Sequence, residues 1–139
     1  MRWVIREQVA VDRLACAWLI RRFLDPEAEF VFVAEGERPL PEDAEPFDIP
    51  GVRLSHRDGH ATVHTMLRDY DLKDPVLERI ARLVDEADVG QEIALEPAAS
   101  GLDLICRGLR RMSPDDQVAL ERGQVIYDAL YAQLASEFS

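Results

Sequence analysis

The chain has 139 residues, the size of one ordinary domain, and its 47% hydrophobic content is enough for one core. Its 16 basic and 27 acidic residues give a formal net charge of −11, which argues against general binding to nucleic acid or anionic membranes. The N-terminal segment is too short and too charged for a signal peptide, and no apolar run approaches the roughly 18 residues of a membrane span. We therefore expect a cytoplasmic protein. Two cysteines, Cys16 and Cys106, are too few for a disulfide framework and predict buried free thiols.

The first half of the sequence predicts short strands around one helix. Apolar runs bounded by turn residues predict three strands, at 2–6, 29–34 and 52–55. Asp12 is a typical N-cap residue for a helix over 13–24, which Asp25 and Pro26 end. The acidic segment 35–46 holds three prolines and predicts an exposed loop.

The second half predicts helices only. After a turn at 56–59, a helix is expected over about 62–70, and a second from Pro75 to a stop at 87–90. A third is expected over 97–112. A fourth begins at a cap at 113–116 and runs to about Arg122, and a fifth covers 124–136. Gly123 is interpreted as the stop between the last two. Strands first and helices later predict an α+β fold. We expect a single layer-packed domain over 1–139, with a small sheet of about three short strands and about five helices.

All three histidines of the chain fall within nine residues, as His56, His60 and His64. If residues 60–64 are helical, His60 and His64 lie on one face within reach of one metal ion, and His56 approaches from the strand end. A carboxylate from Asp88, at a helix end, or from Asp115 or Asp116, at a helix start, would complete the predicted site. Such mixed ligands suit Zn, Mn, Fe or Ni. The alternative is a polar turn with surface histidines and one satisfied, half-buried histidine.

A cationic patch lies at the N-terminal end of this acidic chain. Residues 1–24 carry five arginines against two acidic residues. Arg6, Arg13 and Arg21 could bind a small oxyanion beside the N-terminus of the helix that begins at Asp12. The alternative is a solvated face that pairs with the acidic loop. In either case, we predict that any chemistry lies where this helix meets the histidine segment.

Several segments of the chain resemble one known family. The run 11–30, VDRLACAWLIRRFLDPEAEF, resembles the signature of the ChrB C-terminal domain, the chromate-resistance family; so do 3–7, 47–52, 54–56, 70–75 and 125–132. The resemblance implies a bacterial cytoplasmic protein associated with chromate resistance. Longer relatives carry an extra N-terminal region and act as chromate-responsive transcriptional regulators. Without that region, we do not expect this chain to bind nucleic acid alone.

The histidine segment divides when it is set against the family pattern. His56 and Asp116 match that pattern, whereas His60 and His64 are particular to this sequence. Relatives tend to have an acidic residue near the position of His64. If the family site uses His56 with a carboxylate, His64 is expected to replace that carboxylate as a ligand.

Two main hypotheses follow for function. The first is a stand-alone chromate-resistance domain that binds one divalent transition metal and acts in chromate or metal stress; if it is catalytic, the metal activates water or binds an oxyanion. Its expected ligands are His56 and His64 with Asp88 or Asp116, and His60 as a further ligand. The second is an oxyanion-sensing or protein-interaction module without metal, which binds a small inorganic anion such as chromate at Arg6, Arg13 and Arg21. A homodimer formed through the last helix is a third option.

Overall fold

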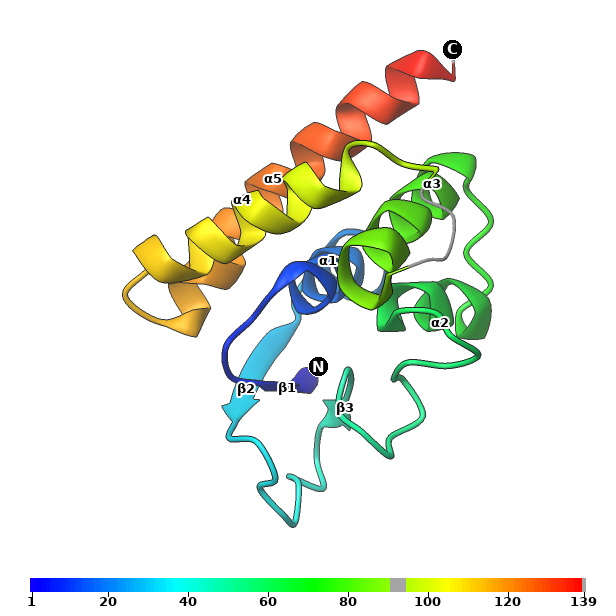
Figure 1. Cartoon of the computed structure of the whole chain (residues 1–139). Helices are drawn as coiled ribbons and strands as arrows, with labels where there is room; N and C mark the ends of the chain where they lie inside the picture. Colours follow the sequence, from blue (N-terminus) through cyan, green and yellow to red (C-terminus); the bar gives the residue numbers. More distant parts are fainter. Residues whose placement is uncertain (91–94, 139) are drawn as a thin grey trace.

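The computed structural model describes residues 1–90 and 95–138. Within them, three short strands lie on one side of the molecule and five α-helices on the other, two of them continued by a π-helical turn (Figure 1). The predicted α+β fold is confirmed. No helix in this part of the chain is both long and apolar enough to cross a membrane.

The sheet is parallel, in the order β2-β1-β3, with β1 (Arg2–Arg6) at its centre. β2 (Glu29–Val33) pairs with β1 along its whole length, and β3 (Glu45–Pro46) contributes only two residues. The strand predicted at 52–55 is wrong. That segment turns back on itself, since the amide of Val52 donates to the carbonyl of Ile49, and β3 fills the free edge of β1 instead.

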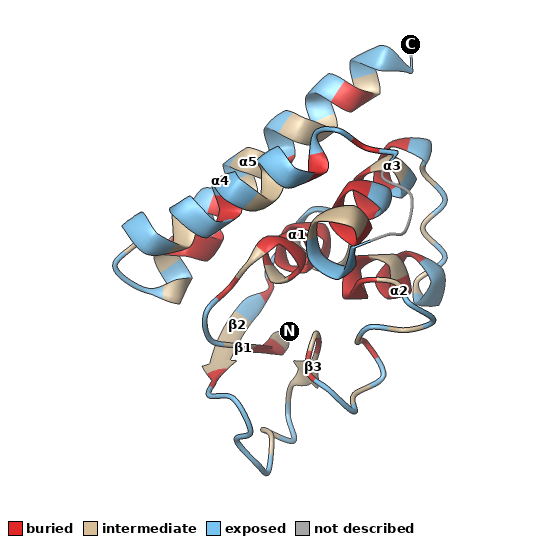
Figure 2. Ribbon diagram, in the orientation of Figure 1, coloured by how far each residue is buried: buried red, intermediate tan, exposed pale blue. Residues whose placement is uncertain are grey.

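The central helix α1 (Val11–Leu19) packs against the other α-helices and continues as the π-helical turn η1 (Ile20–Leu24). Every residue of α1 except Arg13 is buried, and Figure 2 shows this helix at the centre of the buried layer. Trp18 contacts the rings of Tyr127 and Tyr131. Cys16 and Cys106 are buried free thiols, as predicted.

Helices α2 (Thr62–Asp69) and α3 (Pro75–Val84) lie beside α1, and α3 continues as the π-helical turn η2 (Asp85–Val89). The predicted start of α3 at Pro75 is confirmed, and its predicted stop at 87–90 falls at the end of η2 rather than of α3. Asp74 caps α3 by accepting a hydrogen bond from the Val76 amide at 2.8 Å. Gly90 ends η2 with a φ of 80°, a conformation that glycine adopts without strain.

Helices α4 (Ala99–Met112) and α5 (Asp116–Glu137) form an antiparallel pair across α1 (Figure 1). Asp115 caps α5 through the Val118 amide, as the sequence predicts. The predicted helix stop at Gly123 is wrong, because α5 runs through it without a break. Gly123 serves packing: a Cβ atom there would lie 2.9 Å from Cδ2 of the buried Leu14.

Candidate metal centre

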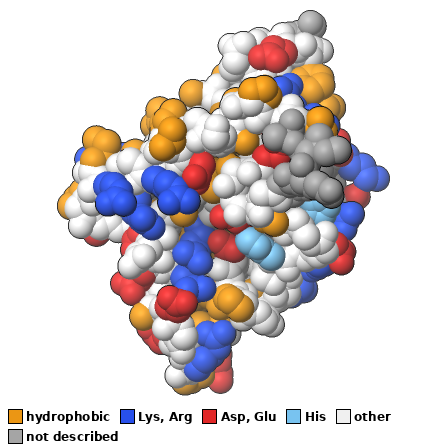
Figure 3. Space-filling view, in the orientation of Figure 1, with side chains coloured by type: hydrophobic (Ala, Val, Ile, Leu, Met, Phe, Trp, Pro, Cys, Tyr) orange, Lys and Arg blue, Asp and Glu red, His pale blue; other side chains and the backbone are white. Residues whose placement is uncertain are grey.

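A pocket of about 460 Å³ opens where the N-terminus of α1, the 48–56 loop and η2 meet. Its ionisable lining residues come from β1, α1, the 48–56 loop and η2: Arg6, Asp12, Arg13, Asp48, His56 and Asp88. Figure 3 shows acidic, basic and histidine side chains gathering near the middle of one face of the molecule. The pocket therefore joins the start of α1 to the histidine segment, where we expected any chemistry to lie.

The sequence predicted that Asp12 caps its own helix, and this is wrong. Asp12 instead caps the start of α2. The N-cap position of α1 is Ala10, and Asp12 is the second residue of the helix. Its buried carboxylate accepts hydrogen bonds from two amides in the first turn of α2, Thr62 at 2.9 Å and Val63 at 3.1 Å. The positive end of the α2 dipole favours a carboxylate at this point. Asp12 is thus fixed in place by backbone contacts.

Asp48 is held in the pocket by contacts on both of its oxygen atoms. Oδ1 accepts the hydroxyl proton of Thr62 at 2.8 Å, and Oδ2 lies 3.2 Å from Nε of Arg13. Its φ of 52° is left-handed, which costs an L-residue roughly 1 kcal/mol and is common at functional sites. Burial, followed by the charge of Asp12, raises the pKa of Asp48 to about 7.

His56 points one ring nitrogen at three carboxylates. Its Nε2 lies 3.2 Å from Oδ2 of Asp12, 3.1 Å from Oδ2 of Asp88 and 3.6 Å from Oδ1 of Asp48. The hydrogen bond to Asp12 raises the pKa of His56 to about 9, with further contributions from the three acidic charges. Burial, and then the charge of Asp12, raises the pKa of Asp88. One N–H cannot donate to three acceptors at once, so His56 alone does not satisfy the three carboxylates.

These distances match the spacing of ligands around one ion. Ligand atoms about 2.1 Å from a tetrahedral ion lie about 3.4 Å from one another. Nε2 of His56 lies 3.1 to 3.6 Å from the nearest oxygens of Asp12, Asp48 and Asp88. One potential ligand atom from each of His56, Asp12 and Asp48 lies within 4.8 Å of the other two, so these three residues can hold a divalent cation, with Asp88 beside the imidazole.

The predicted arginine set is only partly brought together. Arg6 and Arg13 line the pocket, but both are paired: Arg6 with Glu35 at 3.0 Å, and Arg13 with Asp48 and two backbone carbonyls. Arg21 does not line the pocket. It binds Glu121 at 2.7 Å and lies over the ring of Phe30.

The structure also separates the predicted histidine ligands. His60 and His64 lie together beside Asp85 and line a second pocket that excludes His56. The turn between His56 and His60 reverses the chain, with hydrogen bonds in both directions between the backbones of residues 57 and 60. Asp116 joins neither group. Its two oxygens accept the amides of residues 8 and 9, both at 3.0 Å.

Three carboxylates near the histidines were missed in the sequence: Asp12 was predicted only as a helix cap, and Asp48 and Asp85 were not predicted to act at all. Asp48 stands in an irregular segment whose pattern predicts no partner. Asp85 left a signal, since it follows Ala81 by four residues on the apolar face of α3. A charged residue on a buried stripe indicates a specific partner, and Asp85 has one in His60.

Comparison with known proteins identifies the family. This chain belongs to the ChrB C-terminal domain family, whose model matches residues 3–134, so the resemblance seen in the sequence is confirmed. A curated relative, Protein ChrB of Cupriavidus metallidurans, is 35% identical over 136 residues, which are 97% of this chain and 41% of the relative. The chain therefore spans about two fifths of the length of that relative. No solved structure matches the chain.

Proposed function

We propose that this chain is a metal-binding domain that acts in chromate resistance and holds one divalent transition-metal ion in the His56 pocket. The ligands would be His56, Asp12, Asp48 and Asp88. The observation that carries the proposal is the crowding of three carboxylates within 3.6 Å of one imidazole nitrogen. Burial and mutual repulsion of these carboxylates raise the pKa values of Asp48 and Asp88, and a bound cation would relieve that cost.

The link to chromate comes from family membership, since the chain matches the ChrB C-terminal domain over nearly its whole length. The longer relative has further sequence beyond the matched part, so its complete activity is not transferred to this chain. What the family supports is a role in chromate resistance, and the pocket supplies a physical candidate for that role.

The surroundings of the pocket favour a well-ordered set of ligands. Thr62 holds Asp12 through its amide and Asp48 through its hydroxyl, and Arg13 holds the other oxygen of Asp48. Such outer contacts orient ligands and typically alter metal affinity by about 10- to 100-fold. One imidazole with carboxylates suits Mn, Fe or Zn, and the bound ion would supply Lewis-acid chemistry toward water or an oxyanion.

The alternative is an oxyanion-sensing module, supported by the presence of Arg6 and Arg13 in the same pocket. Their positive charges are already paired, and an anion entering the metal-free pocket would face three carboxylates. Direct anion binding is therefore less favourable than cation binding. Chromate or sulfate binding to the metal-free protein, lost in Arg13→Ala, would favour this alternative.

The metal proposal is tested on protein purified without a histidine tag. We expect about one equivalent of Mn²⁺ to bind in a calorimetric titration, and we expect His56→Ala to abolish that binding. Mn²⁺ is a suitable probe because it prefers oxygen-rich ligand sets. Less than about a tenth of an equivalent of bound metal, with no thermal shift on adding Mn, Fe, Zn or Ni, would eliminate the proposal.

A further inference from the structure

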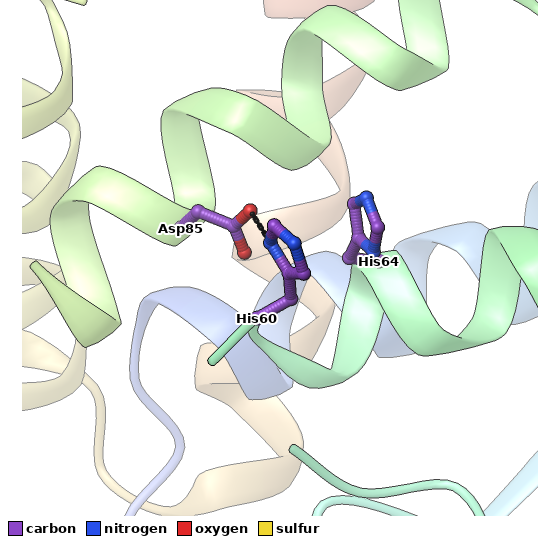
Figure 4. Close-up of side chains that lie close together, drawn as sticks. All are labelled: His60, His64 and Asp85. Carbon is purple, nitrogen blue, oxygen red and sulfur yellow. Dashed lines mark hydrogen bonds and ion pairs between the residues drawn. The ribbon is translucent and has the colours of Figure 1, made fainter. Parts of the chain in front are cut away.

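His60 and His64 face each other at the start of α2. Their rings are nearly parallel, with centroids 4.0 Å apart and an angle of 17° between the planes. Asp85 approaches from η2, and its Oδ2 lies 2.7 Å from Nδ1 of His60 (Figure 4). One potential ligand atom from each of the three residues lies within 4.8 Å of the other two.

The carboxylate of Asp85 is rigidly placed. It is buried, and its Oδ1 accepts the amide of Ala61 at 2.8 Å. Its Oδ2 faces Nδ1 of His60, and a cation between these two atoms would take the place of the proton that they share. A carboxylate oxygen and an imidazole nitrogen are both ordinary ligands of divalent transition metals.

His64 is also prepared to act as a ligand. Its ring is half-buried, and burial followed by the neighbouring His60 lowers its pKa below the ordinary 6.5. The ring is therefore neutral at pH 7 and retains a lone pair, the form that binds metal ions.

The pocket beside these residues has room for a hydrated ion, with a volume of about 530 Å³. Its charged lining is balanced, with three basic and three acidic side chains: Arg68, Lys73, Arg82, Asp71, Glu78 and Asp85. Attraction by net charge is therefore weak here, and the two imidazoles determine what binds.

We propose that His60, His64 and Asp85 form a second metal site, separate from the His56 pocket, for a divalent ion that prefers imidazole nitrogen, such as Zn²⁺ or Ni²⁺. The His56 pocket offers one nitrogen and three carboxylates, whereas this site offers two nitrogens and one carboxylate. Nitrogen-rich sets favour Zn²⁺ and Ni²⁺ over Mn²⁺. The two sites therefore differ in the ions they select.

The test is a Zn²⁺ titration of the untagged full chain, followed by calorimetry and by the ring signals of its three histidines in NMR spectra. His64→Ala and His56→Ala form a matched pair, because each removes one imidazole from a different site. We expect two equivalents of Zn²⁺ in the wild type and one in each variant. In His64→Ala, the affinity of the second site should fall at least about tenfold, while Mn²⁺ binding stays unchanged.

Failure of this proposal is distinguishable from failure of the first. One equivalent in the wild type that is lost in His56→Ala, with His64 signals unmoved by Zn²⁺, overturns the second site and leaves the first. One equivalent that is lost in His64→Ala, with His56 signals unmoved, supports the second site and counts against the first. His64→Gln, which keeps a polar side chain on the same helix face, should behave as His64→Ala; full retention of Zn²⁺ in both variants overturns the proposal.

Discussion

Asp48→Asn removes one negative charge from the His56 pocket with little change of shape. Asparagine tolerates the φ of 52°, and its amide oxygen can still accept the Thr62 hydroxyl proton. The pKa of Asp48 is raised from 3.8 to about 7 in the folded protein, so its carboxyl loses stabilising free energy as pH rises from about 4 to about 7. The asparagine variant avoids this loss, although it weakens the pair with Arg13. We expect the metal-free variant to gain stability relative to wild type across that pH range.

The opposite result is expected when metal is present. An ion at 100 times its Kd stabilises the wild type by about 2.7 kcal/mol. At about 2.1 cal/mol/K per residue, a chain of 139 residues unfolds with an entropy of about 0.29 kcal/mol/K, so Tm rises by about 9 °C. If loss of the Asp48 charge weakens binding about 100-fold, the same metal concentration equals Kd. The stabilisation then falls to about 0.4 kcal/mol and the shift to about 1 °C.

The assay is thermal unfolding followed by circular dichroism at pH 7.5, with and without Mn²⁺. Asp58→Asn is the matched control, because it makes the same substitution at a φ of 54° on an exposed side chain outside the pocket. The control should show the full metal-induced shift. An equal shift in Asp48→Asn and wild type would refute the assignment of Asp48 as a ligand.

Three further predictions concern His56, Gly123 and Asp116. In metal-free protein, an NMR titration of the His56 ring should give a midpoint near the pKa of about 9. The free energy of folding that the protonated His56 contributes is complete below about pH 6.5 and is lost as pH rises through 9. A midpoint at 6.5 would contradict the contacts of His56 with the three carboxylates. Gly123→Ala should destabilise the protein by about 1–3 kcal/mol in urea unfolding, because its Cβ would overlap Leu14, whereas Gly108→Ala, with nothing within 4 Å, should be neutral or stabilising. Asp116→Ala should cost about 1–3 kcal/mol by leaving two amides without their acceptor, and unchanged Mn²⁺ affinity would separate it from the ligands.

The fold could be predicted where short-range chemistry decides it. Asp74 followed by Pro75 favours a helix start through contacts within a few residues, and the cap at Asp115 is equally local. The errors arose where a distant partner decides the outcome. Gly123 has the composition of a helix stop, yet it is required by Leu14 on another helix. The segment 52–55 has the apolar pattern of a strand, but that pattern does not say which later residues will pair with the free edge of β1. Residues 45–46 form that pair instead.

The candidate site could be located from the sequence but not assembled. The expectation that the start of α1 meets the histidine segment agrees with the 3.2 Å approach of Asp12 to His56. The spacing of four residues predicted that His60 and His64 are neighbours if residues 60–64 are helical; α2 begins only at Thr62, and the two rings stack nevertheless. The pairing of His56 with His64 was not found, because a tight turn directs them into different pockets. The spacing of residues in a sequence does not predict the direction of the chain after such a turn.

The start of α2 connects the two candidate sites. No side chain within α2 or at its N-cap position caps the helix, and three amides at its beginning are accepted by Asp12 and Asp85 from outside. Each carboxylate that holds the helix also faces a histidine, so the same contacts that order α2 order the ligands. Replacing Asp12 or Asp85 therefore costs folding free energy, about 1–3 kcal/mol for each unsatisfied amide, in addition to a ligand. Within residues 1–90 and 95–138, no backbone amide donates to the side chain of His56 or His64, so their replacement separates metal binding from folding.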